Sequence, residues 1–422
     1  MEKEQNNTFS RRGFLGGGLT AGLSISLMGY LRGEEKIQGF NETKTDTDDS
    51  VWKPFSDKKL RVGIVGYGRC RFGADFGFQD HPNVDVVAVS DLVPERRAGL
   101  AAACRCEKTY DSLEEMLKDD SIEAIYLATD APSHARQSVM VLEHGKHVCH
   151  AVPAFFGDID DGERLLEAVK KNSGLKYMMF ETSVFRDDLY AMEKLYAAGV
   201  FGEIAYSEGE YHHTMSIGEP FLESYGGWRN NSAPMWYPTH SSAYYVGITH
   251  GRFIDVSARG VRPQKGEDPF TVQNPYDTCV NPFGCEISLS RTSDGGLFRM
   301  ARSHTQGETI EGGRVRGQYA GFDSHNARID GFVGDAEGKR RLEAALAGGL
   351  NLKKYALPPG VSPGGHGGSH GYLMDSFVRS VLLDQPTKVG IRDALHMTVM
   401  GYYAHISALK DGETITIPEY SF

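Results

Sequence analysis

An apolar run that breaks at glycines, RVGIVGYGRCR from Arg61 to Arg71, constrains this chain more than any other feature. A strand that ends in such a turn is typical of a dinucleotide-binding unit. Gly66 suits the tight turn, Gly68 lets the backbone approach a pyrophosphate, and the helix that follows presents its N-terminal amides to the phosphates. Because Arg71 stands where the third glycine of the usual fingerprint belongs, the motif needs support from neighbouring segments.

That support comes from a second apolar segment, residues 84–91, which ends in the carboxylate of Asp91. An acid at this position accepts hydrogen bonds from the ribose hydroxyls and repels a 2′-phosphate. The sequence therefore predicts NAD rather than NADP as the cofactor, although Arg96 and Arg97 follow closely and weaken this preference. The alternative interpretation of Asp91 is an ordinary acidic turn residue after a strand.

Strand-like and helical segments then alternate as far as Phe180. We expect strands at 124–129, 147–150 and 177–180, and helices at 112–115, 132–144 and 158–172. This alternation predicts an α/β fold that begins with a doubly wound parallel sheet of the Rossmann type. Ligands bind at the carboxyl ends of such strands. The residues expected to line the cofactor site there are Thr129, Ala131, His134, Ala151, Val152 and Pro153.

After Phe185 the pattern changes, and residues 183–422 are expected to form a second domain. Residues 204–214 alternate like a sheet strand, and aromatic side chains cluster between residues 211 and 245. Aromatic faces with a few fixed polar groups suit sugar rings. We therefore expect a Rossmann domain over 59–182, followed by an α+β substrate domain with a large, mostly antiparallel sheet and long helices at 372–383 and 393–409.

The beginning of the chain is predicted to be an export signal followed by a flexible tether. Ser10-Arg11-Arg12-Gly13-Phe14-Leu15 precedes a glycine-rich, mildly apolar run, and this pattern over residues 1–33 resembles a twin-arginine export signal. Residues 34–58 are polar and acidic and predict a flexible tether. We expect a periplasmic protein, anchored if the signal stays uncleaved and otherwise without a membrane partner; a frayed amphipathic N-terminus is the alternative.

Composition argues against several other classes of protein. The net charge is −11, from 45 Lys and Arg against 56 Asp and Glu, and nucleic-acid phosphates need clustered cations. We therefore expect no nucleic-acid partner. The six cysteines include no CxxC pair, so the sequence predicts neither a zinc ribbon nor a disulfide scaffold, and no metal cofactor.

The bipartite layout, together with the strand-end sequence GKHV at 145–148, resembles the Gfo/Idh/MocA oxidoreductases over residues 59–422. Three stretches are most similar to the NAD-dependent glycosidase branch of that family, typified by α-N-acetylgalactosaminidase. These stretches are Met179–Ser183, Trp236–His240 and Gly365–Gly368. The family resemblance also implies that an exposed sheet in the second domain pairs copies of the chain into a homo-oligomer.

The resemblance implies roles for individual residues. NAD contacts are implied at Gly66, Gly68, Cys70, Arg71, Asp91, Thr129, Ala131, His134, Ala151, Val152, Pro153 and Thr182. Sugar contacts are implied at Tyr211, His213, Arg229, Tyr237, Pro238, Thr239, His240 and His366. Much of the family carries Glu-Lys-Pro where this chain has Ala151-Val152-Pro153, so the usual lysine acid or base is missing. The glycosidase branch has Glu-Val-Pro there, which matches the missing lysine but not the missing glutamate.

With Val152 in the lysine position, His240 or Tyr237 is the expected catalytic base. The sequence predicts an oxidoreductase that transfers hydride between tightly bound NAD and a small carbohydrate. One alternative is a redox-neutral glycosidase. Such an enzyme oxidises a sugar hydroxyl, eliminates the glycosidic substituent, adds water and reduces the ketone again. A second is a non-catalytic periplasmic sugar-binding protein. A third, a metal-dependent hydrolase using His212, His213, His240 and His366, lacks any HExxH spacing.

Overall fold

The computed structural model describes residues 51–68, 70–213, 227–229, 231–262, 281–305, 309–324 and 332–422. The export signal predicted at 1–33 and most of the tether predicted at 34–58 lie outside these residues. Asp49–Phe422 form one unit by their contacts, and the described part of it contains two β-sheets.

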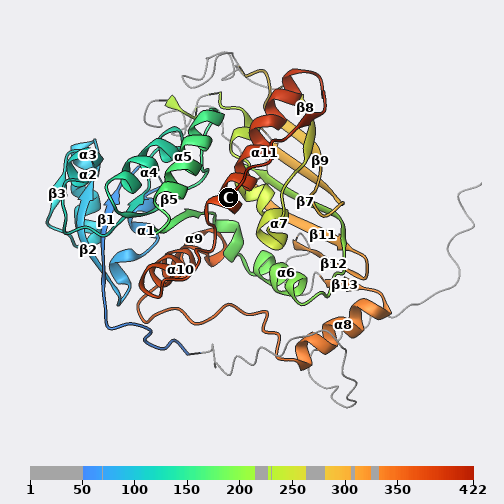
Figure 1. Cartoon of the computed structure of the whole chain (residues 1–422), viewed down its shortest axis with the longest axis horizontal. Helices are drawn as coiled ribbons and strands as arrows, with labels where there is room; N and C mark the ends of the chain where they lie inside the picture. Colours follow the sequence, from blue (N-terminus) through green and yellow to red (C-terminus); the bar gives the residue numbers. More distant parts are fainter. Residues whose placement is uncertain are drawn as a thin grey trace, which may run out of the picture. The chain divides into compact units, whose positions relative to one another are not determined.

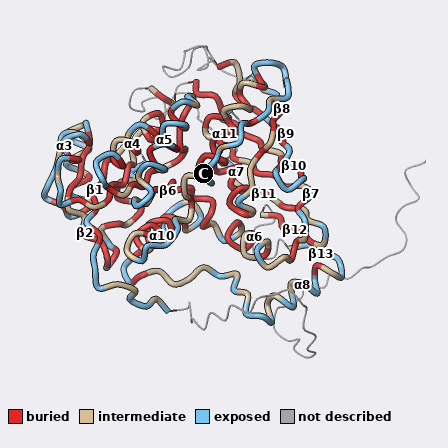
Figure 2. Tube along the Cα trace, in the orientation of Figure 1, coloured by how far each residue is buried: buried red, intermediate tan, exposed pale blue. Residues whose placement is uncertain are grey.

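The first sheet has the order β3-β2-β1-β4-β5-β6, and each of its neighbouring strand pairs is parallel (Figure 1). Its strands are β1 (Leu60–Val65), β2 (Val84–Ser90), β3 (Thr109–Tyr110), β4 (Ala124–Leu127), β5 (His147–Ala151) and β6 (Tyr177–Phe180). This is the strand order of a Rossmann fold, and it confirms the doubly wound sheet that the sequence predicts. The strands β1, β4 and β6 are almost continuously apolar because both faces of the sheet are covered (Figure 2).

The helices of this domain follow the predicted alternation with local differences. They are α1 (Phe72–Asp75), α2 (Pro94–Cys104), α3 (Leu113–Met116), α4 (His134–Glu143) and α5 (Ile159–Lys171). The predicted cap of α3 is confirmed, because Oγ of Ser112 accepts the Glu115 N–H at 3.3 Å. The helix predicted from 132 begins instead with a 3₁₀ turn, η2 (Ala131–Ser133), which carries Pro132 in its first turn.

The second sheet has the order β13-β12-β11-β7-β10-β9-β8-β14, and β7 with β10 is its parallel pair. Its strands are β7 (Ile204–His212), β8 (Asp255–Val261), β9 (Cys285–Arg291), β10 (Leu297–Ser303), β11 (Ile310–Gly317), β12 (Ala320–Asp323), β13 (Phe332–Gly334) and β14 (Ile415–Thr416). The other pairs are antiparallel, so the large, mostly antiparallel sheet predicted from the sequence is confirmed.

Helices of the second half cover this sheet and also reach the first one. They are α6 (Asp187–Ala197), α7 (Thr239–Thr249), α8 (Ala336–Ala347), α9 (Gly365–Gly368), α10 (His370–Leu382) and α11 (Ile391–Leu409), with 3₁₀ turns η3 (Thr182–Phe185) and η5 (Pro234–Trp236). Helix α7 packs on β7 and α11 packs on β8, whereas α10 contacts β1 of the Rossmann sheet. A buried pair ties α10 to the first domain, since Nε2 of His81 lies 3.0 Å from Oδ1 of Asp375.

One glycine determines how closely α7 approaches the sheet. A Cβ on Gly209 of β7 would lie 1.9 Å from the carbonyl oxygen of Ser241 in α7. Any side chain at this position would therefore push the helix outward. The close approach brings the start of α7 down to β7, where the candidate site lies.

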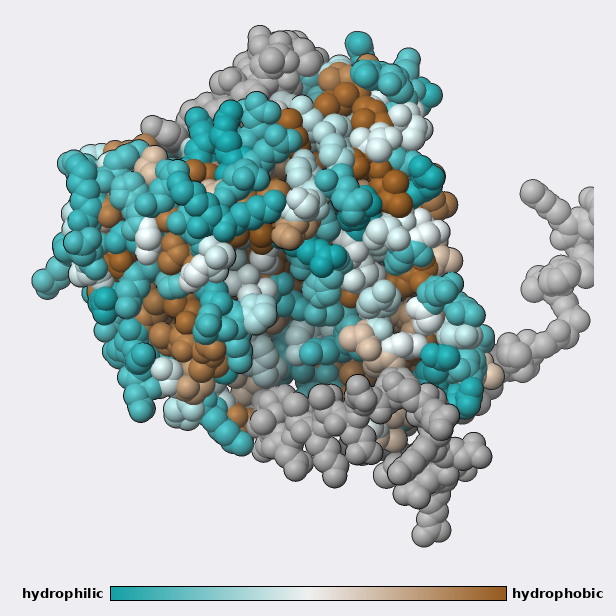
Figure 3. Space-filling model, in the orientation of Figure 1, coloured by the Kyte–Doolittle hydropathy of each residue, from teal (hydrophilic) through white to brown (hydrophobic). Residues whose placement is uncertain are grey.

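Within the described part of the chain, none of the helices combines the length and the apolar run needed to cross a bilayer. Figure 3 shows that one face of the molecule is mainly hydrophilic, with hydrophobic residues in separate patches.

His250 links three helices, α6, α7 and α11. It ends α7 in the left-handed region, and its Nδ1 lies 2.8 Å from Oδ2 of Asp393 near the start of α11. Its Nε2 lies 3.8 Å from Oε1 of Glu193 in α6. Hydrogen bonds to Asp393 and then to Glu193 raise the pKa of His250 to about 9.

We expect His250→Gln to destabilise the protein in a pH-dependent way. A pKa raised above its unfolded value of about 6.5 stabilises the fold fully below that pH, and the contribution is lost as pH rises through the folded pKa. The melting temperature of the variant should therefore lie below that of the wild type at pH 6 and meet it by pH 10. His144→Gln, at the exposed end of α4, is the matched control and should show no such trend. A gap for His250→Gln that does not vary with pH would contradict this assignment.

Candidate active site

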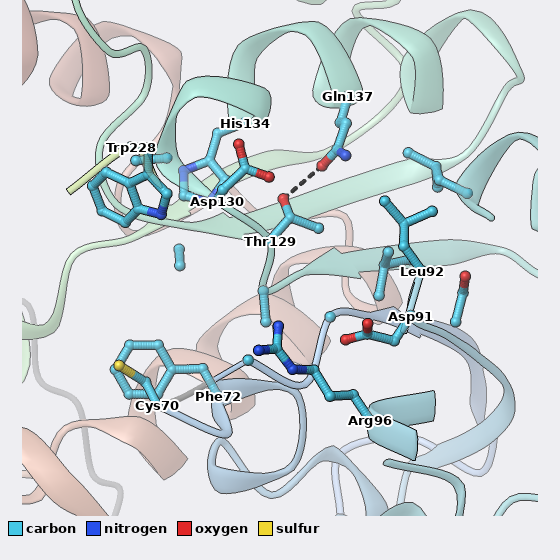
Figure 4. Close-up of a pocket in the computed structure, with 18 of the residues that line it drawn as sticks. Cys70, Phe72, Asp91, Leu92, Arg96, Thr129, Asp130, His134, Gln137 and Trp228 are labelled. Carbon is cyan, nitrogen blue, oxygen red and sulfur yellow. Dashed lines mark hydrogen bonds between the residues drawn. The ribbon is translucent and has the colours of Figure 1, made fainter. Parts of the chain in front are cut away.

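A cleft lies at the carboxyl ends of β1, β2, β4 and β5, where the sequence predicts the cofactor site. Figure 4 shows Asp91, Leu92 and Arg96 toward one side of it and Trp228 and His134 toward the other. The lining residues are Val65, Gly66, Gly68, Cys70, Arg71, Phe72, Ser90, Asp91, Leu92, Arg96, Leu113, Glu114, Ala128, Thr129, Asp130, Ala131, His134, Gln137, Ala151, Val152, Trp228, Arg229 and Tyr237. The structure thus gathers most of the predicted NAD-contacting residues around one space.

The glycine turn has the geometry that a dinucleotide needs. Gly66 has a φ of +101°, and a Cβ there would lie 2.4 Å from the carbonyl oxygen of Ala128. A Cβ on Gly68 would meet no protein atom within 4 Å, so that glycine faces open space in the cleft. Such a space lets the pyrophosphate of a dinucleotide lie close to the backbone of the turn.

The third glycine of the fingerprint is present, two residues later than the usual spacing. A Cβ on Gly73 in α1 would lie 2.3 Å from the carbonyl oxygen of Gly66, so this residue permits the close helix–strand packing. Arg71, at the usual position, is the left-handed residue that caps α1. Helix α1, whose N-terminal amides were predicted to face the phosphates, has only four residues, so its dipole is weaker than that of a longer helix.

Asp91 is held in the orientation that ribose recognition requires. Its Oδ2 accepts the Tyr67 N–H at 2.7 Å and its Oδ1 accepts the Val93 N–H at 2.9 Å. Each carboxylate oxygen keeps a further lone pair. Asp91 therefore fits the two ribose hydroxyls of NAD while facing the cleft.

The loops after β4 and β5 form the middle of the cleft. Thr129 Oγ1 lies 2.6 Å from Oε1 of Gln137, as Figure 4 shows. Nδ1 of buried His134 donates to the carbonyl oxygen of Pro153 at 3.1 Å and thereby ties the two loops together. Pro153 acts here through its carbonyl group and does not line the cleft, whereas Ala151 and Val152 do.

A small aromatic cluster connects these loops to the second domain. Phe156, after β5, makes edge contacts with Trp228 at 5.4 Å and with Trp236 at 5.3 Å between ring centroids. The Arg229 guanidinium lies 4.0 Å above the Trp228 ring, and Tyr237 packs against the same cluster. The second domain therefore closes one end of the cofactor cleft.

Beyond Tyr237 lies a buried carboxylate–imidazole pair. Glu181 follows β6 directly, and its Oε1 lies 2.7 Å from Nδ1 of His240 near the start of α7. The same oxygen accepts the Ser183 N–H at 2.9 Å, and Oγ1 of Thr182 lies 3.5 Å from His240 Nδ1. Burial lowers the pKa of His240, but the Glu181 carboxylate raises it by more, so the net pKa lies above the ordinary value.

Other predicted sugar-contacting residues surround His240. The Tyr211 ring meets it edge-on at 4.7 Å, and the Tyr237 ring lies 5.6 Å away. The ring of His366 stacks on it at 6.2 Å. His213 lies one step further out, 5.7 Å from Tyr211. These residues come from β7, η5, α7 and α9, which only the tertiary fold brings together.

Pro238 and Thr239, which were predicted to contact the sugar, are buried at the start of α7 and do not line the cleft. Pro238 packs against Gly401 of α11. Both residues place His240, which follows them.

Two residues near His240 have no role predicted from the sequence. Glu181 lies within the Met179–Ser183 stretch, and its position directly after a predicted strand of a parallel sheet points to the site. Arg302 on β10 is 1% exposed and reaches Tyr211 through the register of β10 with β7. No local sequence pattern marks it.

The described residues contain no group of three or more His, Cys, Asp and Glu side chains placed to hold a metal ion. Of the four histidines named for a metal-dependent hydrolase, His240 bonds Glu181, and His366 Nδ1 lies 2.8 Å from Nε2 of His370.

The fold and the cleft together define a protein with two β-sheets, whose Rossmann half binds a dinucleotide. Residues 60–180 match the model of the Gfo/Idh/MocA oxidoreductase family, described as an NAD-binding Rossmann fold. This match confirms the resemblance predicted from the sequence and the NAD cofactor over that part of the chain.

Several relatives are named glycosyl hydrolase family 109 proteins. A glycosyl hydrolase family 109 protein of Porphyromonas gingivalis is 27% identical over 234 residues, which are 50% of this chain and 48% of the relative. A glycosyl hydrolase family 109 protein 1 of Bacteroides fragilis is 32% identical over 203 residues, 46% of this chain and 41% of the relative. The chain thus spans less than half the length of these two relatives.

Solved structures share the fold across both domains. Scyllo-inositol dehydrogenase from Lactobacillus casei, with bound NAD(H) and scyllo-inositol, has a TM-score of 0.64 at 15% identity, covering 85% of this chain and 99% of that one. Levoglucosan dehydrogenase in complex with NADH and levoglucosan has a TM-score of 0.65 at 16% identity, covering 86% and 100%.

We expect Gly68→Ala to fold normally and to bind NADH about tenfold more weakly, because its methyl group meets no protein atom and enters the space for the pyrophosphate. NADH fluorescence titration and the melting temperature measure the two effects. Gly174→Ala, which also meets no atom within 4 Å but does not line the cleft, is the control and should change neither. Equal NADH affinity in both variants would show that the dinucleotide does not pass over Gly68.

Proposed function

We propose that this protein is an NAD-dependent oxidoreductase that acts on a sugar or glycoside and keeps its cofactor bound during turnover. The observation that carries the proposal is the buried Glu181–His240 pair beside the end of the cleft that Val152 and Tyr237 line. NAD, when bound, supplies a hydride acceptor. The residues named below supply the proton acceptor and hold the sugar.

His240 is the base in this proposal. Its Nδ1 faces Glu181, and its Nε2 makes no hydrogen bond with any described residue, which leaves that nitrogen for a sugar hydroxyl. Glu181 stabilises the imidazolium that forms and so strengthens the base. Nε2 takes the proton of the sugar hydroxyl while hydride leaves the carbon that bears this hydroxyl, and a carbonyl group results.

Tyr237 serves as a hydrogen-bond donor rather than as a second base. Burial raises the pKa of its phenol to about 12, although the nearby Arg229 guanidinium lowers it. The group therefore stays protonated at neutral pH. From the wall of the cleft it can donate to the sugar oxygen and orient it toward His240.

The names of the relatives favour a second candidate, a redox-neutral glycosidase. Oxidation of one sugar hydroxyl to a ketone acidifies the adjacent C–H bond. Loss of that proton expels the glycosidic substituent, water adds to the resulting double bond, and the hydride returns to the ketone. The sum is hydrolysis without consumption of NAD. The glycosyl hydrolase family 109 names of the two matched relatives support this cycle.

The test screens sugars and 4-nitrophenyl glycosides with the purified protein and analyses the nucleotide released on denaturation. We expect His240→Ala to lower the turnover rate about 10²- to 10⁴-fold while NADH affinity stays within twofold of wild type. His144→Ala, an exposed histidine at the end of α4, should change neither.

The same experiment distinguishes an enzyme from a non-catalytic sugar-binding protein. A non-catalytic sugar-binding protein would bind glycosides and never turn them over, with or without His240. Release of 4-nitrophenol without accumulation of NADH favours the redox-neutral cycle, and accumulation of NADH favours the simple dehydrogenase.

We also propose a periplasmic location, on the strength of the Ser10–Leu15 pattern. A protein that leaves the cytoplasm folded carries a cofactor loaded there, which suits a closed redox cycle. Replacing Arg11 and Arg12 by lysine should retain the protein in the cytoplasmic fraction; unchanged fractionation would contradict the proposal.

A further inference from the structure

Arg302 is the largest fully buried side chain among the described residues and lies directly behind the candidate site. It occupies β10 opposite Tyr211 of β7 and is 1% exposed. A cation in such surroundings is costly unless its charge is used or compensated. Burial lowers the pKa of its guanidinium to about 10, so it stays charged at neutral pH.

The contacts of Arg302 reach the site from two sides. Its Nη1 donates to the carbonyl oxygen of Tyr211, and its Nε donates to that of Pro234 in η5 at 3.3 Å. Its Cζ lies 4.4 Å from the centroid of the Tyr211 ring and 5.9 Å from that of Tyr237. Tyr211 therefore contacts both the Arg302 cation and the ring of His240.

No described carboxylate lies within 4.0 Å of the Arg302 nitrogens. Glu311 and Glu181 act on its charge and raise its pKa, and buried Glu286 lies opposite it on the neighbouring strand β9. Glu181 bonds His240, while Glu311 accepts from Ser183 Oγ at 2.7 Å and pairs with Arg186 at 3.4 Å. Glu286 bonds Nδ1 of His405 at 2.7 Å. These carboxylates therefore have hydrogen-bond partners other than Arg302, whose guanidinium lies over the Tyr211 ring.

We propose that Arg302 is a positioning residue of the reaction, which fixes Tyr211 and the Pro234–Tyr237 turn and supplies a buried, permanent positive charge behind Tyr211. The proposal rests on the proposed function. The charge stabilises the negative charge that develops on the sugar oxygen as its proton moves to His240. It also opposes Glu181, so that His240 does not hold its proton too tightly.

This role explains how the site works with Val152 at the end of β5. In this chain Val152 is neutral, and Arg302 presents its charge from the second sheet, behind Tyr211.

The test compares two neutral variants, Arg302→Gln and Arg302→Met, with Arg302→Lys and with Glu181→Gln. The titratable or charged groups that face His240 are Glu181 before η3, Tyr211 on β7, Tyr237 after η5, Arg302 on β10, Glu311 on β11 and His366 in α9. Glutamine retains a donor for the Tyr211 carbonyl while it removes the charge. The readouts are the acid limb of the pH profile of kcat/KM and the NMR titration of the His240 ring in the NAD-loaded protein.

We expect Arg302→Gln and Arg302→Met to lower kcat about tenfold or more and to move the acid limb and the ring titration up by about one pH unit. Arg302→Lys should return both toward wild type. Glu181→Gln should move the limb in the opposite direction, to lower pH, because it removes the carboxylate that raises the pKa of His240.

Unchanged titration in the neutral variants, or a lysine variant that titrates like glutamine, would overturn the proposal and leave Arg302 a purely structural residue. The melting temperatures show which of the two neutral variants is folded, and the titration is interpreted for that variant. If the wild type turns over no sugar, the proposed function fails. The ring titration still tests the effect of Arg302 on His240 in that case.

Discussion

The hydrogen bond between Glu181 and His240 is the interaction on which the rest of the account depends. It joins the end of the last Rossmann strand, β6, to the first turn of α7 on the second sheet. A buried carboxylate and a buried imidazole are each costly alone, so each requires the other. Gly209 makes the pairing possible, since it lets α7 approach β7 closely enough to place His240 against Tyr211. The pair therefore couples the packing of the two domains to the strength of the base.

Around this pair, the Rossmann half provides the cofactor site and the second half provides the candidate sugar site. The Rossmann half supplies the open cradle at Gly68 and the oriented carboxylate of Asp91, both of which fit NAD. The second half supplies the aromatic wall and the buried cation, Arg302, which suit an uncharged ring whose oxygen becomes negative during reaction. The contact of Phe156 with Trp228 and Trp236 closes one end of the cofactor cleft between them. Such closure excludes water and favours a cofactor that stays bound.

The sequence predicted the parts of this protein that depend on local patterns. The apolar run before Gly66, the carboxylate of Asp91 and the alternation of segments were enough for the Rossmann sheet and its strand-end residues. The usual spacing of the fingerprint points to position 71, which is Arg71, for its third glycine. The turn before α1 is two residues longer than that spacing, and Gly73 takes the role. Arg302 could not be found, because its place behind Tyr211 depends on the register of β10 with β7, which no local pattern encodes.

Single-turnover absorbance at 340 nm tests the central claim most directly. The protein is freed of unbound nucleotide, and a sugar that it turns over is added with no NAD in solution. We predict an absorbance of bound NADH, at most one per chain, whose formation is faster at higher pH as His240 loses its proton. Turnover of the same sugar with no such absorbance at any pH, or with a protein that contains no dinucleotide, would contradict this mechanism.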